Sequence, residues 1–358
     1  MKKLQFAMVG GGNGALIGDI HRIGAQFDDL AELKAGCFSR HWDKNLEAGE
    51  KWGVEPGRIY PDYHTMLEEE AKRTGEDRLD FVVVATPNNT HYEIVKDIIA
   101  HGFHIVCDKP VTFTSRESEE LKALAQEKDL LFGVSYSYAH YAILEQAKKM
   151  IADGVLGKIH TIAAEYPQEW VGLNTALRGK DGLTWRVDPA ICGPSGVIAD
   201  IGTHVEYLIS KVTGLKPVRV LARLRSIPDY VPVESDAQVL IDYDNGAAGI
   251  FWTSFAMVGK SCCMKVRIYG DKGGMEWNAH DFMELRVDIA GQPTQIWSAN
   301  YDYCDPQARK SCPRGCRRPS TPCSPTSTGV TVPICCPGRR AKMSGPSPTP
   351  ISMTASRG

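Results

Sequence analysis

Short apolar runs alternate with amphipathic stretches of helical period through the first third of the chain. The run at residues 4–9 ends in glycines, and a helical pattern follows at about 15–27 with Leu16, Ile20, Ile23 and Phe27 on its apolar face. The alternation continues with strands at 32–38, 79–85, 103–107 and 130–134 and with helices at 43–52, 63–72, 92–101 and 115–128. Strands that are separated by helices form a parallel sheet with helices on both faces. Residues 1–134 are therefore predicted to form an α/β domain.

The pattern changes after this segment. A helical stretch at 142–152 and a glycine-rich segment near 193–202 precede several strand-like runs with turn signals between them. The predicted strands are 218–225, 237–243, 247–255, 264–269 and 285–289. Asp244-Asn245-Gly246 has the composition of a hairpin turn. We expect residues 135–303 to form an α+β domain with a mostly antiparallel, open sheet.

The composition changes abruptly at Cys304. The last 55 residues hold ten prolines, eight serines, six threonines and no aromatic residue, without a helical or strand period. Such a segment buries too little apolar surface to offset the entropy of ordering it, so we predict that residues 304–358 form a disordered tail. Out-of-frame translation from about residue 304–312 would produce this composition, and we offer a frameshift as a hypothesis. The cysteine pairs of the tail match no usual zinc-ligand spacing, and we predict no metal site.

Charge is distributed unevenly along the chain. The net charge of the 358 residues is −2, but residues 1–303 carry 32 Lys and Arg against 42 Asp and Glu, a net charge of about −10. This acidic body argues against nucleic acid or an anionic membrane as a partner. The apolar run at 4–9 ends too soon for a signal-peptide core or a membrane span, so a cytoplasmic location is expected.

A glycine-rich pattern stands where the first predicted strand turns into a helix. Gly10, Gly12 and Ala15 form a G-x-G-x-x-A motif that also contains Asn13. Small residues there let the backbone approach a pyrophosphate, whose charge is stabilised at the helix N-terminus. A lone glycine cluster can be an ordinary turn, but this position favours a dinucleotide. We therefore predict a Rossmann-type domain that binds NAD or NADP.

The end of the second predicted strand bears on the choice of cofactor. A NAD site usually offers an acidic residue to the ribose there, whereas this chain has Ser39 and Arg40 and no acid before Asp43. An arginine suits a 2′-phosphate, so NADP is mildly favoured over NAD. The alternative for Arg40 is a solvated surface side chain.

Two further loops follow buried strands. Thr86, Pro87, Asn88 and His91 come after the strand at 79–85. Cys107-Asp108-Lys109-Pro110 comes at the end of the following strand. Ligands bind in the crevice outside the carboxyl ends of parallel strands, so both loops are candidates for contact with the nicotinamide and the reacting carbon. By itself, a lysine such as that at 109 is more often a surface residue.

The glycine-rich segment of the second domain carries a carboxylate and an imidazole. If a helix starts near Asp200, then Asp200 and His204 lie on one face at i, i+4. A carboxylate next to an imidazole can orient it and stabilise its protonated form, which is the geometry of a general acid/base. The pair can equally be a helix N-cap and a core histidine.

These motifs together resemble those of the glucose–fructose oxidoreductase/inositol dehydrogenase/MocA (Gfo/Idh/MocA) family. The resemblance rests on their order and separation over about residues 3–300: the glycine-rich turn, Ala85-Thr86-Pro87-Asn88 with His91, Lys109-Pro110, and Asp200-Ile201-Gly202-Thr203-His204. Two features depart from the family pattern. Asp108 stands where the family usually has Glu, and the tail replaces helices that in the family follow the sheet.

The resemblance implies roles for particular residues. Lys109 would polarise the substrate oxygen and also contact the cofactor, His204 would move the proton, and Asp200 would set the imidazole while a hydride passes between the substrate carbon and nicotinamide C4. Residues similar to the substrate-pocket residues of sugar-oxidising members are Tyr136, Tyr138, Trp185 and Arg186, although core packing explains the aromatic ones equally well. The resemblance also implies a homo-oligomer, a dimer or tetramer formed through the open sheet face.

We therefore expect an oxidoreductase that acts on a hydroxyl-bearing carbon of a sugar or cyclitol. One alternative is an NAD-dependent glycosidase, which uses hydride transfer transiently and releases sugar without net cofactor turnover. Another is a non-catalytic sensor that binds the dinucleotide as a signal. The chain retains Lys109, Asp200 and His204, which such a sensor would not need.

Overall fold

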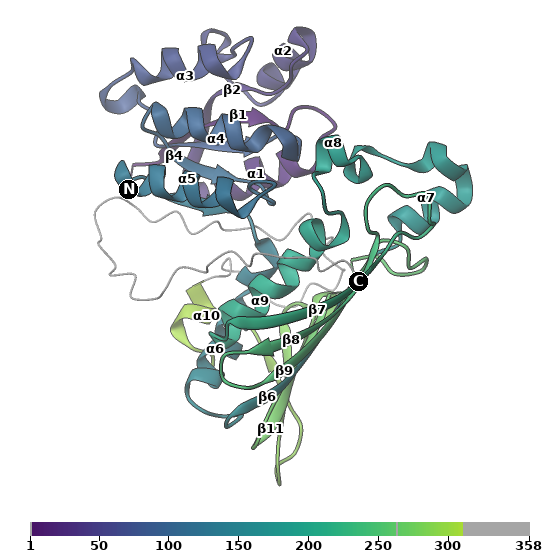
Figure 1. Ribbon diagram of the computed structural model, residues 1–358. Helices are drawn as coiled ribbons and strands as arrows, with labels where there is room; N and C mark the ends of the chain where they lie inside the picture. The colour runs from purple at the N-terminus through teal and green to yellow at the C-terminus, as the bar shows by residue number, and fades with distance from the viewer. Residues whose placement is uncertain (1, 263, 311–358) are drawn as a thin grey trace. The chain divides into compact units, whose positions relative to one another are not determined.

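The computed structural model describes residues 2–262 and 264–310, which divide into two compact units (Figure 1). The first unit ends at Ser135 and the second begins at Tyr136. The division falls one residue from the boundary that the change of sequence pattern predicts.

The first unit is a parallel sheet covered by helices. Its strand order is β2-β1-β3-β4-β5. The strands are β1 (Leu4–Gly10), β2 (Ala31–Cys37), β3 (Phe81–Ala85), β4 (His104–Cys107) and β5 (Phe132–Val134). The helices are α1 (Leu16–Gln26), α2 (Trp42–Lys51), α3 (Tyr63–Ala71), α4 (His91–Ala100) and α5 (Ser115–Glu127). The predicted parallel α/β domain is confirmed.

The central strands of this sheet are buried on both faces. Along β1, Ala7 and Val9 belong to one hydrophobic core, while Phe6 and Met8 belong to a second core on the opposite face. A strand that is buried on both faces needs a continuous apolar run rather than an alternating one. This requirement explains why the run at 4–9 identifies a central strand.

Helix α1 turns a different face to the sheet from the one predicted. Leu16 is 61% exposed and Ile23 is 46% exposed, whereas the buried side of the helix includes Gly18, Gly24 and Ala25. A Cβ on Gly18 would lie 1.9 Å from the carbonyl oxygen of Gly11, so the helix passes too close to the preceding turn for a side chain. The predicted apolar face is wrong for Leu16 and Ile23, whereas Ile20 and Phe27 are partly buried, because close backbone packing selects small residues on the side of the helix next to the turn.

The second unit is built on an eight-stranded sheet in the order β13-β12-β11-β10-β6-β9-β8-β7. Only the β6 and β9 pair is parallel among its strand pairs, so the predicted mostly antiparallel sheet is confirmed. The strands are β6 (Ile159–Pro167), β7 (Pro217–Arg225), β8 (Asp236–Tyr243), β9 (Ala248–Ser254), β10 (Lys265–Gly270), β11 (Gly273–Asn278), β12 (Glu284–Ile289) and β13 (Gln295–Ser298). The helices are α6 (Ala142–Ala152), α7 (Trp170–Arg178), α8 (Pro189–Cys192), α9 (Thr203–Thr213) and α10 (Pro306–Lys310).

One face of this sheet forms the core of the unit, together with α6 and α9. Val239 and Ile241 of β8 are buried in the same cluster as Ile143 of α6 and Leu208 of α9. Leu240, which points to the opposite face, is exposed. The sheet is therefore covered on one side by helices of its own unit.

The start of the predicted tail belongs to the second unit. Cys304 and Ala308 are buried, and the backbone N–H of Asp305 donates a 2.7 Å hydrogen bond to the side-chain oxygen of Gln146 on α6. Residues 304–310 therefore include helix α10 and contact α6, which differs from the predicted disorder of this part of the tail. The rest of the predicted disordered tail, 311–358, lies outside the described residues, as do four of the cysteines considered for zinc and Cys323.

The sequence predicts neither a membrane-spanning helix nor a metal site. No helix among the described residues is long and apolar enough to cross a membrane. Residues 2–262 and 264–310 also contain no group of three or more His, Cys, Asp or Glu side chains arranged to hold a metal ion.

Candidate dinucleotide and substrate sites

The glycine-rich turn lies between the carboxyl ends of β2 and β3. Gly10, Gly11 and Gly14 have positive φ angles of 78°, 72° and 84°, a conformation that glycine adopts at little cost. The N–H of Gly12 donates to the carbonyl of Phe38 at 3.1 Å, and a Cβ on Gly12 would lie 2.7 Å from that oxygen. The turn therefore leaves no room for a side chain at Gly12.

The strand order places this turn at the point where the chain switches direction across the sheet. The chain runs from β1 to β2 on one side and then crosses to β3 on the other side of β1. A crevice forms at the carboxyl ends of two such strands, and in doubly wound sheets it binds the cofactor. Gly10 is paired with Ala85, so the loop that begins at Thr86 starts beside the turn.

One positive side chain contacts the turn, and another follows the strand end that is bonded to the turn. Arg40 is exposed and lies two residues after Phe38, whose carbonyl is bonded to Gly12. Lys51, at the end of α2, donates from Nζ to the Oδ1 of Asn13 at 3.1 Å. The sequence interpretation missed Lys51, since a lysine at a helix end carries no local signal of a partner 38 residues away. Both cations can attract a phosphate group bound at the turn.

His91 holds together the loops that follow β3 and β4. Its side chain is fully buried, with Nε2 2.9 Å from the carbonyl oxygen of Thr86 and Nδ1 2.8 Å from that of Pro110. The hydroxyl of Thr90 also donates, at 2.7 Å, to the carbonyl oxygen of Pro87. We infer that His91 positions these loops, and its predicted role as a cofactor-contact residue stays a prediction.

Asp108 anchors the loop that carries Lys109. Its Oδ1 accepts a 2.6 Å hydrogen bond from the Ser135 hydroxyl and lies 3.7 Å from Nε2 of His21 on α1. Burial would raise the pKa of this carboxyl, but the contacts with His21, the charge of Lys109 and the bond from Ser135 together hold the pKa well below its ordinary value. His21 was missed because nothing local distinguishes it from other polar residues of the helix.

Asp200 lies in a π-helical turn, Ile198–Gly202, that continues directly into α9. The sequence predicts an ordinary helix start here, but the structure has a π-helical turn, which is wider than an α-helix. Such turns are often found at functional sites. Asp200 Oδ1 lies 3.9 Å from Nη1 of Arg186, whose guanidinium lies over the Trp185 ring at 4.8 Å. The structure thus groups three of the predicted site residues.

His204 is 5% exposed and lies edge-on to the rings of Tyr136 and Tyr138, at centroid distances of 5.5 and 5.1 Å. Tyr138 accepts a 2.7 Å hydrogen bond from the Tyr166 hydroxyl, and Tyr136 stacks on Tyr207 at 4.6 Å. Burial raises the pKa of Tyr138, so its hydroxyl stays protonated near neutral pH. The predicted residues Tyr136, Tyr138 and His204 therefore lie in one cluster. Tyr166 and Tyr207 contact the two tyrosines, and the sequence interpretation missed both of them.

Two family models match consecutive parts of the chain. The oxidoreductase family model with an NAD-binding Rossmann fold matches residues 4–136, and the GFO/IDH/MocA C-terminal domain matches residues 144–276. An uncharacterized oxidoreductase of Bacillus subtilis, YfiI, is 38% identical over 307 residues, which are 85% of this chain and 78% of that relative. The chain belongs to the Gfo/Idh/MocA oxidoreductase family. The predicted family and its NAD-binding Rossmann fold are confirmed.

Solved structures of similar proteins have the same fold. An inositol dehydrogenase homolog from Azotobacter vinelandii complexed with NAD+ has a TM-score of 0.81 at 36% identity, covering 86% of this chain and 79% of that one. The complex of that homolog with NADH and myo-inositol has a TM-score of 0.79 at the same identity and coverage. Levoglucosan dehydrogenase from Pseudarthrobacter phenanthrenivorans is 27% identical over 231 residues, 58% of each chain.

The anchored carboxylate of this Gfo/Idh/MocA protein leads to a prediction about stability. Asp108→Asn should lower the free energy of unfolding by about 1–3 kcal/mol at neutral pH, because a buried charged acceptor is lost. The pKa of Asp108 is lowered on folding, so its contribution is fully present above the ordinary value of 3.8 and is lost as the pH falls through the lower folded value. Thermal unfolding from pH 7 to pH 2 measures both effects.

The matched control for this prediction is Asp77→Asn, which changes an exposed carboxylate of the same unit. The difference in Tm between the parent protein and Asp108→Asn should be constant near neutral pH and should narrow in acid. If both substitutions produced the same small, pH-independent change, Asp108 would not be the anchor.

Proposed function

We propose that this oxidoreductase is an NAD(P)-dependent dehydrogenase or reductase that acts on one hydroxyl-bearing carbon of a sugar or cyclitol. The observation that carries the proposal is the grouping around His204, where an imidazole lies beside two tyrosines and, four residues earlier, Asp200 lies near an arginine. Aromatic faces bind the apolar faces of a polyol, and charged groups bind its hydroxyls. An imidazole can accept the proton that leaves with the oxidised hydroxyl.

The residues of the chain divide the reaction between them. The bound nicotinamide supplies hydride transfer at C4. During oxidation of the alcohol, His204 would accept the proton of the hydroxyl group while the hydride leaves the carbon that bears it. The product is a carbonyl. Lys109 would stabilise the negative charge that develops on the substrate oxygen. Asp200, with Arg186 beside it, would orient His204 and bind a substrate hydroxyl.

A panel of sugars and inositols tested with NAD and with NADP examines this function directly. Accumulation of reduced nicotinamide with one class of substrate is the expected result. Release of sugar from a glycoside without net nicotinamide reduction would favour the glycosidase alternative instead. Tight dinucleotide binding with no turnover on the whole panel would favour a sensor.

We propose NADP as the preferred cofactor, on the basis of Arg40 and Lys51 beside the glycine-rich turn. Arg40→Ala should weaken NADP binding by about 1.5–3 kcal/mol through the loss of a charge-assisted contact and should leave NAD binding almost unchanged. Isothermal titration with both cofactors measures the difference. Lys122→Ala is the control, since it removes an exposed positive charge from α5. This helix lies between β4 and β5 in the chain, whereas Arg40 follows β2, the strand at the opposite edge of the sheet from β5. Equal losses for NAD and NADP would show that Arg40 does not bind the 2′-phosphate.

We also propose that the protein forms a homo-oligomer through the outer face of the eight-stranded sheet. Leu221, Leu240 and Ile250 are paired across β7, β8 and β9, and each is at least 51% exposed. A row of exposed apolar side chains on an open sheet is typical of a protein interface. Sedimentation velocity measures the assembly, and a monomer at micromolar concentration would contradict it.

A further inference from the structure

We propose that Glu234 is a positioning residue that fixes the start of the helix carrying Asp200 and His204. The inference rests on the proposed function, because it assigns Glu234 a part in the same reaction. Glu234 lies in the connection between β7 and β8, 34 positions after Asp200 in the sequence.

The helix that carries Asp200 and His204 is capped from outside its own segment. The first N–H groups of a helix have no partner within it and need an acceptor. Val197 stands at the N-cap and has no side chain that can accept a hydrogen bond. Glu234 supplies the acceptors: its Oε1 bonds the N–H of Gly196 at 2.9 Å and that of Ile198 at 3.3 Å, and its carbonyl bonds the N–H of Val197 at 2.9 Å.

The carboxylate of Glu234 accepts a further bond, and its backbone lies close to the segment at 195–196. The Ser195 hydroxyl donates to Oε1 of Glu234 at 2.6 Å. A Cβ on Gly196 would lie 2.4 Å from the carbonyl oxygen of Glu234 and 2.6 Å from a methyl carbon of Val233. The segment therefore approaches the β7–β8 connection as closely as glycine allows. A negative charge at this end also stabilises the helix dipole.

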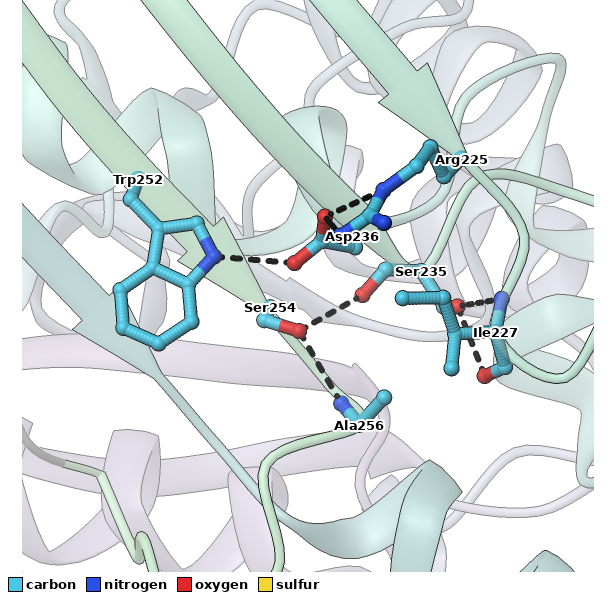
Figure 2. Close-up of polar contacts among 7 residues, drawn as sticks. All are labelled: Arg225, Ile227, Ser235, Asp236, Trp252, Ser254 and Ala256. Carbon is cyan, nitrogen blue, oxygen red and sulfur yellow. Dashed lines mark hydrogen bonds and ion pairs between the residues drawn. The ribbon is translucent and has the colours of Figure 1, made fainter.

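The strand that follows Glu234 is held in place by buried polar contacts (Figure 2). Asp236 is fully buried and accepts hydrogen bonds from Nη2 of Arg225 at 2.6 Å and from Nε1 of Trp252 at 2.9 Å. The Ser235 hydroxyl donates to the carbonyl of Ile227 and accepts from its N–H, at 2.9 and 2.7 Å. These contacts join the two ends of the β7–β8 connection to each other.

A second buried hydroxyl joins the next strand to this base. Ser254 of β9 donates to the carbonyl of Ser235 at 3.3 Å and accepts from the N–H of Ala256 at 3.2 Å. Ser235 and Ser254 are both fully buried. Glu234 therefore precedes residues that are held by several buried hydrogen bonds, and its own bonds attach the segment at 196–198 to that part of the sheet.

The consequence concerns the placement of the reacting groups. Asp200 lies only two residues after Ile198, and its contact with Arg186 and the ring contacts of His204 depend on where this helix begins. Without the carboxylate, the N–H groups of Gly196 and Ile198 and the hydroxyl of Ser195 must find other partners, and the π-helical turn can shift. A displacement of about 1 Å in a catalytic group can lower turnover about 100-fold.

The experiment compares Glu234→Ala and Glu234→Gln with the control Glu276→Gln. The amide oxygen of glutamine can still accept the N–H bonds, so Gln is the conservative replacement. Glu276 is a partly buried, ion-paired carboxylate on the same sheet, and its change tests for general loss of charge. For each variant we would measure Tm, dinucleotide affinity, kcat and KM, and amide hydrogen exchange at residues 196–204.

Glu234→Ala should lower kcat about 100-fold, whereas Glu234→Gln should recover most of it at a similar Tm. Dinucleotide affinity should stay unchanged in both variants, and amide exchange at 196–204 should rise above that of the parent protein in Glu234→Ala alone. Glu276→Gln should keep the parent kcat. Recovery of kcat in Glu234→Gln at a similar Tm would separate a positioning role of Glu234 from a general loss of stability.

The possible failures are distinguishable. A parent protein without turnover on any substrate would contradict the proposed function, and the exchange measurement would still test Glu234. Unchanged exchange at 196–204 in Glu234→Ala would overturn the inference, and so would a parent-like kcat in an active enzyme. If Glu234→Ala fails to fold, Glu234→Gln combined with Ser195→Ala provides a milder loss of the same contacts and is read by the same criteria.

Discussion

Replacement of His204 by asparagine is expected to lower turnover by roughly 10²–10⁴-fold, the usual contribution of a positioned acid/base. Fold and dinucleotide affinity should be retained, because asparagine is smaller than histidine and His204 lies among aromatic rings of the second unit. The rate of alcohol oxidation should rise with pH in the parent enzyme, since the base must be unprotonated to accept the hydroxyl proton. That rise should disappear in His204→Asn.

His140→Asn is the matched control for this prediction. His140 lies in the same unit, and burial and the nearby Lys211 lower its pKa to about 4, so it stays neutral through the range in which activity is assayed. Its replacement should lower Tm, because Lys211 Nζ lies 3.1 Å from Nδ1 of His140, and should leave the pH–rate profile unchanged. Tm and the pH–rate profile are measured on the same preparation of each variant.

The structural alternative for His204 leads to the opposite result. A core histidine would reduce activity only in proportion to the folded fraction, and the surviving enzyme would keep the parent pH profile. A folded His204→Asn variant with near-normal turnover would remove His204 from the mechanism.

Gly12→Val should lower dinucleotide affinity about 100-fold or more, which corresponds to about 2.8 kcal/mol or more. The Cβ of any residue at this position would lie 2.7 Å from the Phe38 carbonyl oxygen, so the turn must shift away from the end of β2. A β-branched side chain would in addition occupy the space in which the backbone approaches the pyrophosphate. Isothermal titration with NAD and NADP measures the loss.

Gly57→Val is the control for this substitution, because Gly57 lies in the same unit and a Cβ there has open space around it. Near-parent affinity is expected for Gly57→Val. Circular dichroism must show that Gly12→Val is folded, and Gly12→Ala provides a smaller perturbation of the same kind. Unchanged affinity in a folded Gly12→Val variant would show that the dinucleotide does not approach this turn.

Much of the first unit could be predicted from local patterns. Buried parallel strands need continuous apolar runs, helices on the surface of a sheet need a periodic apolar face, and a turn with positive φ needs glycine. These requirements act on residues that are adjacent or one helical turn apart. The run at 4–9 and the glycines at 10 and 14 are therefore visible in the sequence without any partner.

The second unit was less predictable, and β6 is the clearest example. This strand pairs with β9 on one side, in parallel, and with β10 on the other. Both partners lie at least 80 residues later in the chain. Its alternating pattern of buried and exposed positions is weak and includes polar residues, so the sequence interpretation missed the strand. Pairing between distant segments decides its place in the sheet.

The sequence by itself determined the α/β followed by α+β organisation, the glycine-rich turn and the residue types at Lys109, Asp200 and His204. Tertiary structure alone decided which face of α1 is buried, that His21 and Ser135 anchor Asp108, and that Glu234 caps the helix of His204. The physical reason is the range of the interactions. Periodicity and backbone conformation are properties of neighbouring residues, whereas a hydrogen bond between residues 27 or 38 positions apart leaves no mark on either local pattern.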